Sequence, residues 1–215
     1  MLTRTLREFR FQVSPDVPGC PGAMIDRAVR QAAIEFCRFT RTWREALDPF
    51  RARDGVAEYE LDLPACALIE SVVFAQHNGV EILPTTEQTL VDTGDTWRTQ
   101  EATQVTNYYL KDRNLLRVYP IPDTTTAKAL DVVVALKPAQ DATELPEILF
   151  NDHLEALGHG ALQRLKAMPR KSWSAPEDVQ YHMAQFERMK KDEKAERLND
   201  YTRESTLRVR PASYW

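Results

Sequence analysis

Hydrophobic residues recur at helical spacing in the first quarter of the chain. Between Pro21 and Trp43 the intervals are three and four residues, which places these residues on one face of a helix. The members of this apolar face are Ile25, Ala28, Val29, Ala32, Phe36, Phe39 and Trp43. Pro21 suits the first turn, where its missing N–H group costs nothing. The pattern therefore predicts a long amphipathic helix over this range.

The period changes to two in the segment Val56–Leu63. Apolar side chains alternate there with acidic ones, as expected for a strand with one buried face and one solvated face. The apolar positions are Tyr59, Leu61 and Leu63, and the acidic positions are Glu58, Glu60 and Asp62. The strand is therefore expected to present its carboxylates on a single face.

Further strands and turns follow as far as Pro138. Strands are predicted at Leu68–Ala75, Val105–Leu110, Leu115–Tyr119 and Leu130–Leu136, and a short helix is predicted at Thr85–Asp92. His77-Asn78-Gly79 supplies turn chemistry after the first of these strands, and Asp112-Arg113-Asn114 separates the second from the third. The last strand is apolar on nearly both faces, which predicts a central position in its sheet.

Helical spacing returns after Pro138. An apolar stripe from Phe150 to Met168, between two prolines, predicts one helix. A second helix is predicted after a short loop, with Ser174 and Glu177 in capping-box spacing. Its apolar face comprises Val179, Met183 and Phe186, and Trp173 in the loop is expected to pack back on the helices. A loop this short predicts an antiparallel helical hairpin.

The order of these elements defines the expected fold class. It is α+β, a helical bundle with a β-rich insertion, because helices and strands are segregated rather than alternating. The bundle comprises one long N-terminal helix and a C-terminal helical hairpin, and an extended tail follows. The expected division is an N-terminal arm with the first long helix at 1–50, the β-rich insertion at 51–139, the helical hairpin at 140–200 and the tail at 201–215.

Composition excludes several classes of protein. With 43% apolar and 28% charged residues among 215, the chain is globular rather than disordered. A net charge of −4 disfavours tight binding of nucleic acid, because phosphate-binding domains are usually basic. The sequence has no apolar run long enough for a membrane span, and its charged N-terminus does not resemble a signal peptide. Cys20, Cys37 and Cys66 form no disulfide or zinc pattern, which is typical of the reducing cytoplasm.

One short motif suggests a catalytic group. Leu90-Val91-Asp92-Thr93-Gly94 resembles the signature of retroviral-type aspartic proteases, in which two chains each contribute one carboxylate. Asp95 follows where that family has a small residue, and no matching late Gly-Arg segment occurs, so an ordinary turn is favoured. A dimeric aspartic peptidase using Asp92 remains one alternative function, and a monomeric peptide-binding module is another.

No other constellation in the sequence indicates an enzyme or a cofactor. His153 and His159 are six residues apart, so a helix does not stack them as a metal site requires. The sequence has no glycine-rich phosphate loop and no nucleophile elbow. We therefore expect a protein without catalytic, cofactor-binding or metal-binding residues.

The C-terminal part of the chain is rich in charge. Phe186–Arg210 holds eight basic and six acidic residues, and this mixture predicts a solvated helix face. The last segment, Ser205–Trp215, is basic and ends in aromatic residues, types that often anchor interfaces. The alternating apolar residues in it would let the tail add as a strand to a partner's sheet. The candidate partner-binding residues are Leu207, Arg208, Val209, Arg210, Tyr214 and Trp215.

Several segments together carry a resemblance to a known family. The chain resembles the head-to-tail adaptor proteins of tailed bacteriophages, which form connector rings. The segments are Ala33–Pro49 (AIEFCRFTRTWREALDP), Tyr59–Pro64 (YELDLP), Leu116–Pro122 (LRVYPIP) and Leu136–Pro176, which includes MPRKSW. The resemblance covers roughly 21–194. It implies a helical bundle with a β-rich insertion and no catalytic residues.

The resemblance also implies a place and partners for the protein. Such adaptors are structural subunits of the virion neck, between capsid and tail, and are assembled in the host cytoplasm. They form homo-oligomeric rings, usually of about twelve copies, that dock under the portal protein and give tail or nozzle proteins a platform. The ring extends the channel through which DNA passes without sequence-specific binding.

A DNA channel gives one strand face a possible role. Acidic walls repel phosphate, whereas basic walls would retard the passing DNA. Glu58, Glu60 and Asp62 are therefore candidate channel-facing residues. An ordinary solvated strand face is the alternative interpretation of the same pattern.

Overall fold

The helical pattern near the N-terminus forms α2 (Gly22–Thr40) in the computed structural model, which describes residues 2–198. Ala32 and Phe36 are fully buried on its inner face. The helix ends where Arg41 adopts a left-handed backbone with φ 55° and donates its N–H to the Cys37 carbonyl. The predicted long helix is confirmed, except that it ends at Thr40, so Trp43 lies beyond it rather than on its apolar face.

An additional helix precedes α2, which the sequence pattern did not predict. The N-terminal arm comprises β1 (Thr3–Thr5), α1 (Leu6–Val13) and the 3₁₀ turn η1 (Ser14–Asp16). α1 buries Leu6, Phe9 and Val13 and contacts α2 and α5. The strand before it pairs antiparallel with β13 (Glu144–Pro146). Charged residues between the buried positions hid this short apolar face in the sequence.

The stripe from Phe150 to Met168 does not lie on one helix. It is divided between α4 (Glu147–Asn151) and α5 (Leu154–Lys166). The chain leaves the helical path at Asp152 and His153, where the Asp152 N–H donates to the Ile148 carbonyl as α4 ends. The break lets the His153 ring pack on Phe36 of α2, with the ring centroids 4.8 Å apart. The expectation of one uninterrupted helix is therefore wrong.

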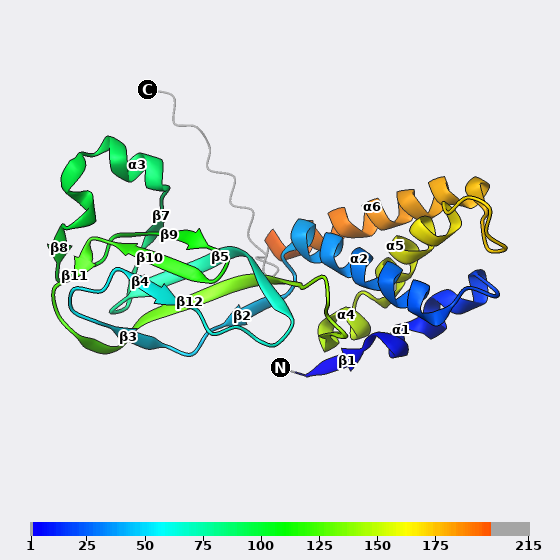
Figure 1. Cartoon of the computed structure of the whole chain (residues 1–215), viewed down its shortest axis with the longest axis horizontal. Coiled ribbons are helices and arrows are strands. Elements are labelled where there is room, and N and C mark those ends of the chain that lie inside the picture. Colours follow the sequence, from blue (N-terminus) through cyan, green and yellow to red (C-terminus); the bar gives the residue numbers. More distant parts are fainter. Residues whose placement is uncertain (1, 199–215) are drawn as a thin grey trace, which may run out of the picture.

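The last described helix, α6 (Pro176–Leu198), forms the expected antiparallel hairpin with α5 (Figure 1). Trp173 in the connecting loop packs against the core, as predicted. The predicted capping box is wrong, because the Ser174 hydroxyl donates to the Lys166 carbonyl instead. The predicted apolar face is wrong at Met183, which is 42% exposed. His182 is buried in its place, because α6 turns a more polar face inward.

The longest strands form a sheet with the order β2-β12-β5-β6, in which β3 also pairs with β12. Its members are β2 (Arg44–Ala46), β3 (Phe50–Ala52), β5 (Ala67–His77), β6 (Val80–Glu81) and β12 (Thr126–Pro138). Leu130, Val134 and Leu136 are fully buried along β12, which confirms the predicted central strand. Asn78 and Gly79 have φ of 52° and 78° and join β5 to β6, as a tight hairpin requires.

A second sheet has the order β4-β10-β9-β7, and a short parallel pair, β8 and β11, lies beside it. The strands are β4 (Glu58–Glu60), β7 (Leu83–Pro84), β8 (Glu101–Ala102), β9 (Asn107–Asp112), β10 (Leu115–Tyr119) and β11 (Ile121–Pro122). The helical turns between them are α3 (Glu87–Asp92) and η2 (Asp95–Arg98). The hairpin of β9 and β10 and the short helix α3 match the prediction. β4 is shorter than expected, so Asp62 lies beyond its end.

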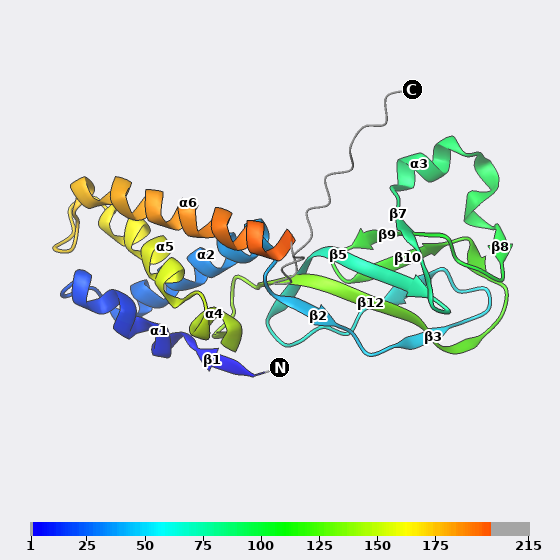
Figure 2. The ribbon, with the colours of Figure 1, turned by 180° about the vertical axis from the view of Figure 1, so that it is seen from behind.

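Helices α1, α2, α4, α5 and α6 occupy one end of an elongated molecule, and the two larger sheets with α3 occupy the other (Figures 1 and 2). β12 reaches toward the helices and contacts α2, and one apolar cluster continues from the helices into the sheets. The architecture is α+β, with helices before and after a β-rich middle part, as the sequence predicts. The domain boundaries proposed from the sequence remain a prediction.

Candidate interaction surfaces

Polar side chains hold α6 against the other helices. The Lys190 side chain is 4% exposed, and its ammonium nitrogen lies 2.6 Å from carboxylate oxygens of Glu35 and Glu187. Arg164 of α5 also pairs with Glu35. A buried ammonium group is tolerated when it is paired, so this network fixes the rotation of α6 about its own axis.

Glu193, one turn further along α6, forms a second buried polar contact. Its carboxylate accepts a hydrogen bond of 2.6 Å from the Thr42 hydroxyl, and Arg197 Nε lies 3.4 Å away. The Arg197 guanidinium donates in turn to the Thr42 carbonyl at 2.6 Å. These contacts attach the end of α6 to the segment that links α2 with the first sheet.

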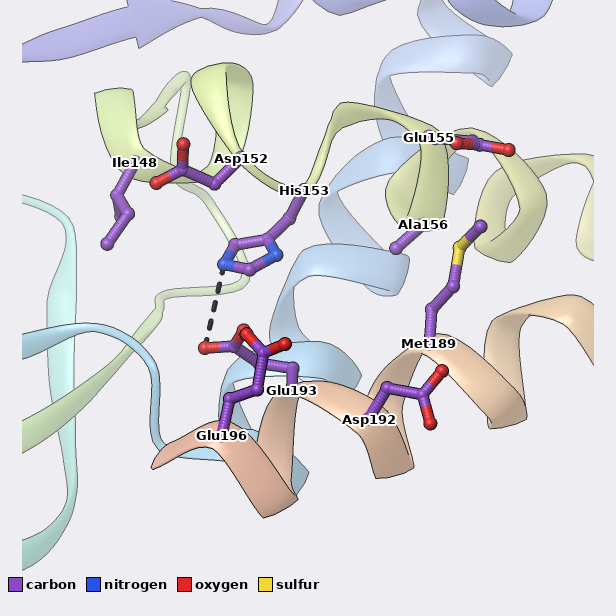
Figure 3. Close-up of a pocket in the computed structure, with 9 residues that line it drawn as sticks. All are labelled: Ile148, Asp152, His153, Glu155, Ala156, Met189, Asp192, Glu193 and Glu196. Atoms are coloured by element: carbon purple, nitrogen blue, oxygen red, sulfur yellow. Dashed lines mark ion pairs between the residues drawn. The ribbon is translucent and has the colours of Figure 1, made fainter. Parts of the chain in front are cut away.

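An acidic cleft of ≈ 400 Å³ opens between α6 and the break between α4 and α5 (Figure 3). Its lining is Ile148, Asp152, His153, Glu155, Ala156, Met189, Asp192, Glu193 and Glu196. The carboxylates of Asp152, Asp192 and Glu196 are exposed and make no hydrogen bond or ion pair with any residue in 2–198. The cleft therefore combines apolar side chains with negative charge that the residues in 2–198 do not neutralise.

His153 lies in the wall of the acidic cleft and points toward Glu193 (Figure 3). Its side chain is 10% exposed, and its Nε2 lies 3.7 Å from Glu193 Oε1. That nitrogen is buried without a hydrogen-bond partner. Burial lowers the pKa of His153, and the Glu193 carboxylate opposes that effect only in part. The ring is therefore neutral at pH 7 and keeps unused hydrogen-bonding capacity inside the cleft.

A basic pocket of ≈ 300 Å³ lies on the other flank of α6, beside the end of α2. It is lined by Arg38, Phe39, Thr40, Arg41, Arg44, Lys194 and Arg197. Arg38, Arg41 and Lys194 are exposed at its rim. Lys194 Nζ lies 4.6 Å from the centroid of the Phe39 ring. The aromatic ring and the cations make this the positive counterpart of the acidic cleft.

These two surfaces were not predicted from the sequence, because the mixed charges after Phe186 indicated a single solvated helix face. The periodicity does contain a signal. Asp192 and Glu196 are four residues apart, Lys190 and Lys194 are also four apart, and the two series are offset by two positions. Two positions correspond to about 200° around a helix, so the series lie on different flanks.

The acidic residues predicted to face a channel lie together at one edge of the second sheet, but their surroundings differ. Glu58 is half-buried, and its carboxylate lies 2.7 Å from both Lys111 Nζ and Arg117. The hydrogen bond from Lys111 is the main reason that the pKa of Glu58 is lowered. Glu60 and Asp62 are exposed. The negative stripe is therefore weaker at Glu58 than the sequence suggested.

Asp92 lies at the end of α3, where it accepts a hydrogen bond of 3.0 Å from Gln88 one turn earlier. The Thr93 hydroxyl donates to the Leu90 carbonyl, and the Gly94 N–H donates to the Val91 carbonyl. The motif is thus an exposed helix end whose hydrogen bonds are local. This arrangement favours the ordinary turn over a peptidase carboxylate.

Some of the residues singled out in the sequence cannot be located, because the structure describes residues 2–198 only. The candidate partner-binding residues Leu207–Arg210, Tyr214 and Trp215 lie outside the described residues. Within residues 2–198, no group of His, Cys, Asp and Glu side chains is large enough to hold a metal ion. No helix in the same range is long and apolar enough to cross a membrane.

Comparison with known proteins gives the family. No curated protein matches the chain. The sequence model of the family described as SU10 adaptor protein matches residues 3–211, which is nearly the whole chain. This match includes both ends of the molecule and the acidic and basic surfaces beside α6. The chain therefore belongs to the SU10 adaptor protein family, a family of phage adaptor proteins.

Proposed function

We propose that this phage adaptor is a structural subunit of a head-to-tail connector ring, in which about twelve copies dock under the portal protein. The observation that carries the proposal is the family match over residues 3–211. The ring extends the DNA channel and gives tail or nozzle proteins a platform. It acts in the virion neck and is assembled in the host cytoplasm.

The shape of the subunit supports this role. An adaptor must bind one partner above and another below, and the elongated chain offers a helical end and a β-rich end (Figures 1 and 2). The apolar cluster that continues from one end to the other makes the subunit a rigid spacer between its partners. Two chemically different ends allow the portal and the tail to bind without competing.

The charge of the subunit supports the role as a DNA conduit. The chain carries a net charge of −4, and Glu60 and Asp62 are exposed carboxylates on the second sheet. We place these two residues and Glu58 toward the channel, where they repel the phosphates of passing DNA. Leu207–Arg210, Tyr214 and Trp215 are the residues that we assign to the contact with the portal.

Reconstitution with the portal protein of the same phage tests the proposal. The purified adaptor is mixed with portal, and the product is examined by electron microscopy and native mass spectrometry. We expect one closed ring of about twelve adaptors attached to each portal. An adaptor that remains monomeric both with and without portal would contradict the proposed function.

A further inference from the structure

The acidic cleft and the basic pocket share α6 as a common wall. Glu193 lines the cleft and Arg197 lines the pocket, and the Glu193 Oε1 to Arg197 Nε distance is 3.4 Å. Asp192 and Lys194 point to different flanks of the helix, because two positions correspond to about 200° of rotation. One copy of the chain therefore carries surfaces of opposite charge that face different directions.

Both surfaces keep charge that the described chain does not neutralise. The carboxylates of Asp152, Asp192 and Glu196 have no ion pair within residues 2–198. On the basic side, Arg41 and Lys194 have no ion pair within the same range. Side chains of this kind cost little to leave in water, but they are ready to pair when a complementary surface approaches.

A second observation in the acidic cleft favours a hydrogen-bond donor supplied by another molecule. His153 Nε2 is buried, has no hydrogen-bond partner and lies too far from Glu193 for a hydrogen bond, at 3.7 Å. In the tautomer whose Nε2 carries no proton, this nitrogen is a buried acceptor without a partner, which is unfavourable. A guanidinium group entering the cleft would supply N–H donors to both the imidazole and the carboxylate.

We propose that the acidic cleft of one copy receives the rim of the basic pocket of the next copy, an inference that rests on the proposed ring. The side chains that enter are Arg41 and Lys194; Arg38 lies at the same rim, with its Nε 3.8 Å from Glu70 Oε2 of its own chain. A closed ring requires a heterologous contact, in which two different surfaces of each chain meet. The chain provides such a pair of surfaces, which carry opposite charges and lie on two flanks of α6.

The apolar side chains of the cleft suit long basic side chains. Ile148, Ala156 and Met189 line the cleft together with the carboxylates. The aliphatic stem of an arginine or lysine packs on such a surface while its charged group reaches the surrounding carboxylates. Passing DNA is a poorer partner for the basic pocket, because contact with phosphates would retard its movement.

Charge reversal on each surface tests the contact. The acid-reversed variant carries Asp192→Lys and Glu196→Lys, and the base-reversed variant carries Arg41→Glu and Lys194→Glu. Asp48→Lys with Glu101→Lys, and Arg188→Glu with Lys191→Glu, are matched controls, because these residues are exposed and lie outside both surfaces. Circular dichroism checks that each variant folds.

Assembly is measured at low salt by sedimentation velocity and native mass spectrometry, for the adaptor alone and on portal. Each reversed variant should assemble at least about tenfold more weakly than the wild type, because like charges then face each other. An equimolar mixture of the two variants should assemble again, since each reversed surface now meets its opposite. The controls should assemble as the wild type does.

Three outcomes would overturn the inference. Rings that form equally well from each reversed variant would show that these surfaces do not meet, and would leave the proposed function intact. Failure of the mixture, with rescue of the acid-reversed variant by Arg208→Glu and Arg210→Glu, would assign the cleft to the tail. A wild type that stays monomeric even on portal would remove both the inference and the proposed function.

Discussion

The helical end and the β-rich end of this adaptor are stabilised in different ways. Within residues 2–198, the buried charged side chains of Lys166, Lys190 and Glu193 and the buried imidazole of His182 all belong to the helical end. The sheets bury one comparable side chain in that range, His77. The β-rich end therefore depends on apolar burial and strand pairing, whereas the helical end also depends on paired charges.

This difference has consequences for function. Apolar burial changes little with pH or moderate salt, while ion pairs respond to both. At the helical end, α6 has buried charges that are paired and also exposed charges on two of its flanks. The comparison predicts that a core substitution in the sheets lowers stability most, and that substitutions at the helical end give effects that depend on charge and pH.

Leu136→Ala in β12 should have the largest effect. Leu136 is fully buried in the central strand, so its truncation removes apolar contacts and leaves a cavity. We expect the free energy of unfolding to fall by about 2–5 kcal/mol. Leu83→Ala is the matched control, because Leu83 is 58% exposed and its loss should cost less than about 0.5 kcal/mol. Equal losses in urea titrations of the two variants would contradict this account of the core.

Glu193→Ala should have the next largest effect. The variant removes the acceptor of the Thr42 hydroxyl and a carboxylate next to Arg197, and leaves those groups buried. We expect a loss of about 1–3 kcal/mol in the free energy of unfolding. Glu193→Gln keeps an oxygen acceptor and should lose less. Glu196→Ala, at an exposed position one turn away, is the control and should stay close to wild type.

Acid should weaken the helical end through a pair of histidines. The Nδ1 atoms of His159 and His182 lie 2.8 Å apart between α5 and α6. Burial lowers the pKa of both rings, and for His182 the nearby Lys166 and then His159 lower it further. Below about pH 6.5 the unfolded chain therefore binds more protons than the folded chain, and stability falls as pH falls.

Unfolding by urea, followed by circular dichroism between about pH 7 and pH 5, measures this effect. Replacing both His159 and His182 with Asn should reduce the decrease in stability, because the Asn side chain does not titrate, while His153, whose pKa is also lowered by burial, still contributes. A double variant with the same pH dependence as the wild type would show that these two rings do not cause it. His77→Asn in β5 tests the one comparable buried imidazole at the other end.

The fold was predictable where a segment has one clear pattern of apolar residues or one clear turn signal. The apolar spacing in Gly22–Thr40 gives α2, and the continuous apolar run in Leu130–Leu136 gives the centre of β12. Asn-Gly at positions 78–79 marks the turn after β5 because both residues tolerate positive φ. Patterns of this kind reflect the local geometry of a helix, strand or turn, so they can be interpreted from the sequence without knowledge of tertiary contacts.

The remaining features depend on tertiary contacts that the pattern does not contain. His153 interrupts a stripe that looked continuous, because its ring packs on Phe36 of another helix. Lys190 and Glu193 looked like solvated residues, yet both are buried beside partners far away in the sequence, Glu35 and Thr42. The charged surfaces around α6 were missed for the same reason. Mixed charge along a helix does not show which residues find partners inside the chain.

Removing the tail should have the smallest effect on the fold and a clear effect on binding. The tail lies outside the described residues, and the buried apolar cluster that spans both ends of the molecule is formed by residues between Leu6 and Phe186. Deletion of Arg208–Trp215 should therefore change the melting temperature little, while it weakens docking to the portal, because aromatic and arginine side chains often anchor interfaces. Binding is measured by titrating portal with the full-length and truncated adaptors and counting the adaptors bound. Undiminished affinity of the truncated protein would show that the tail is not the anchor, and would direct attention to the helical end.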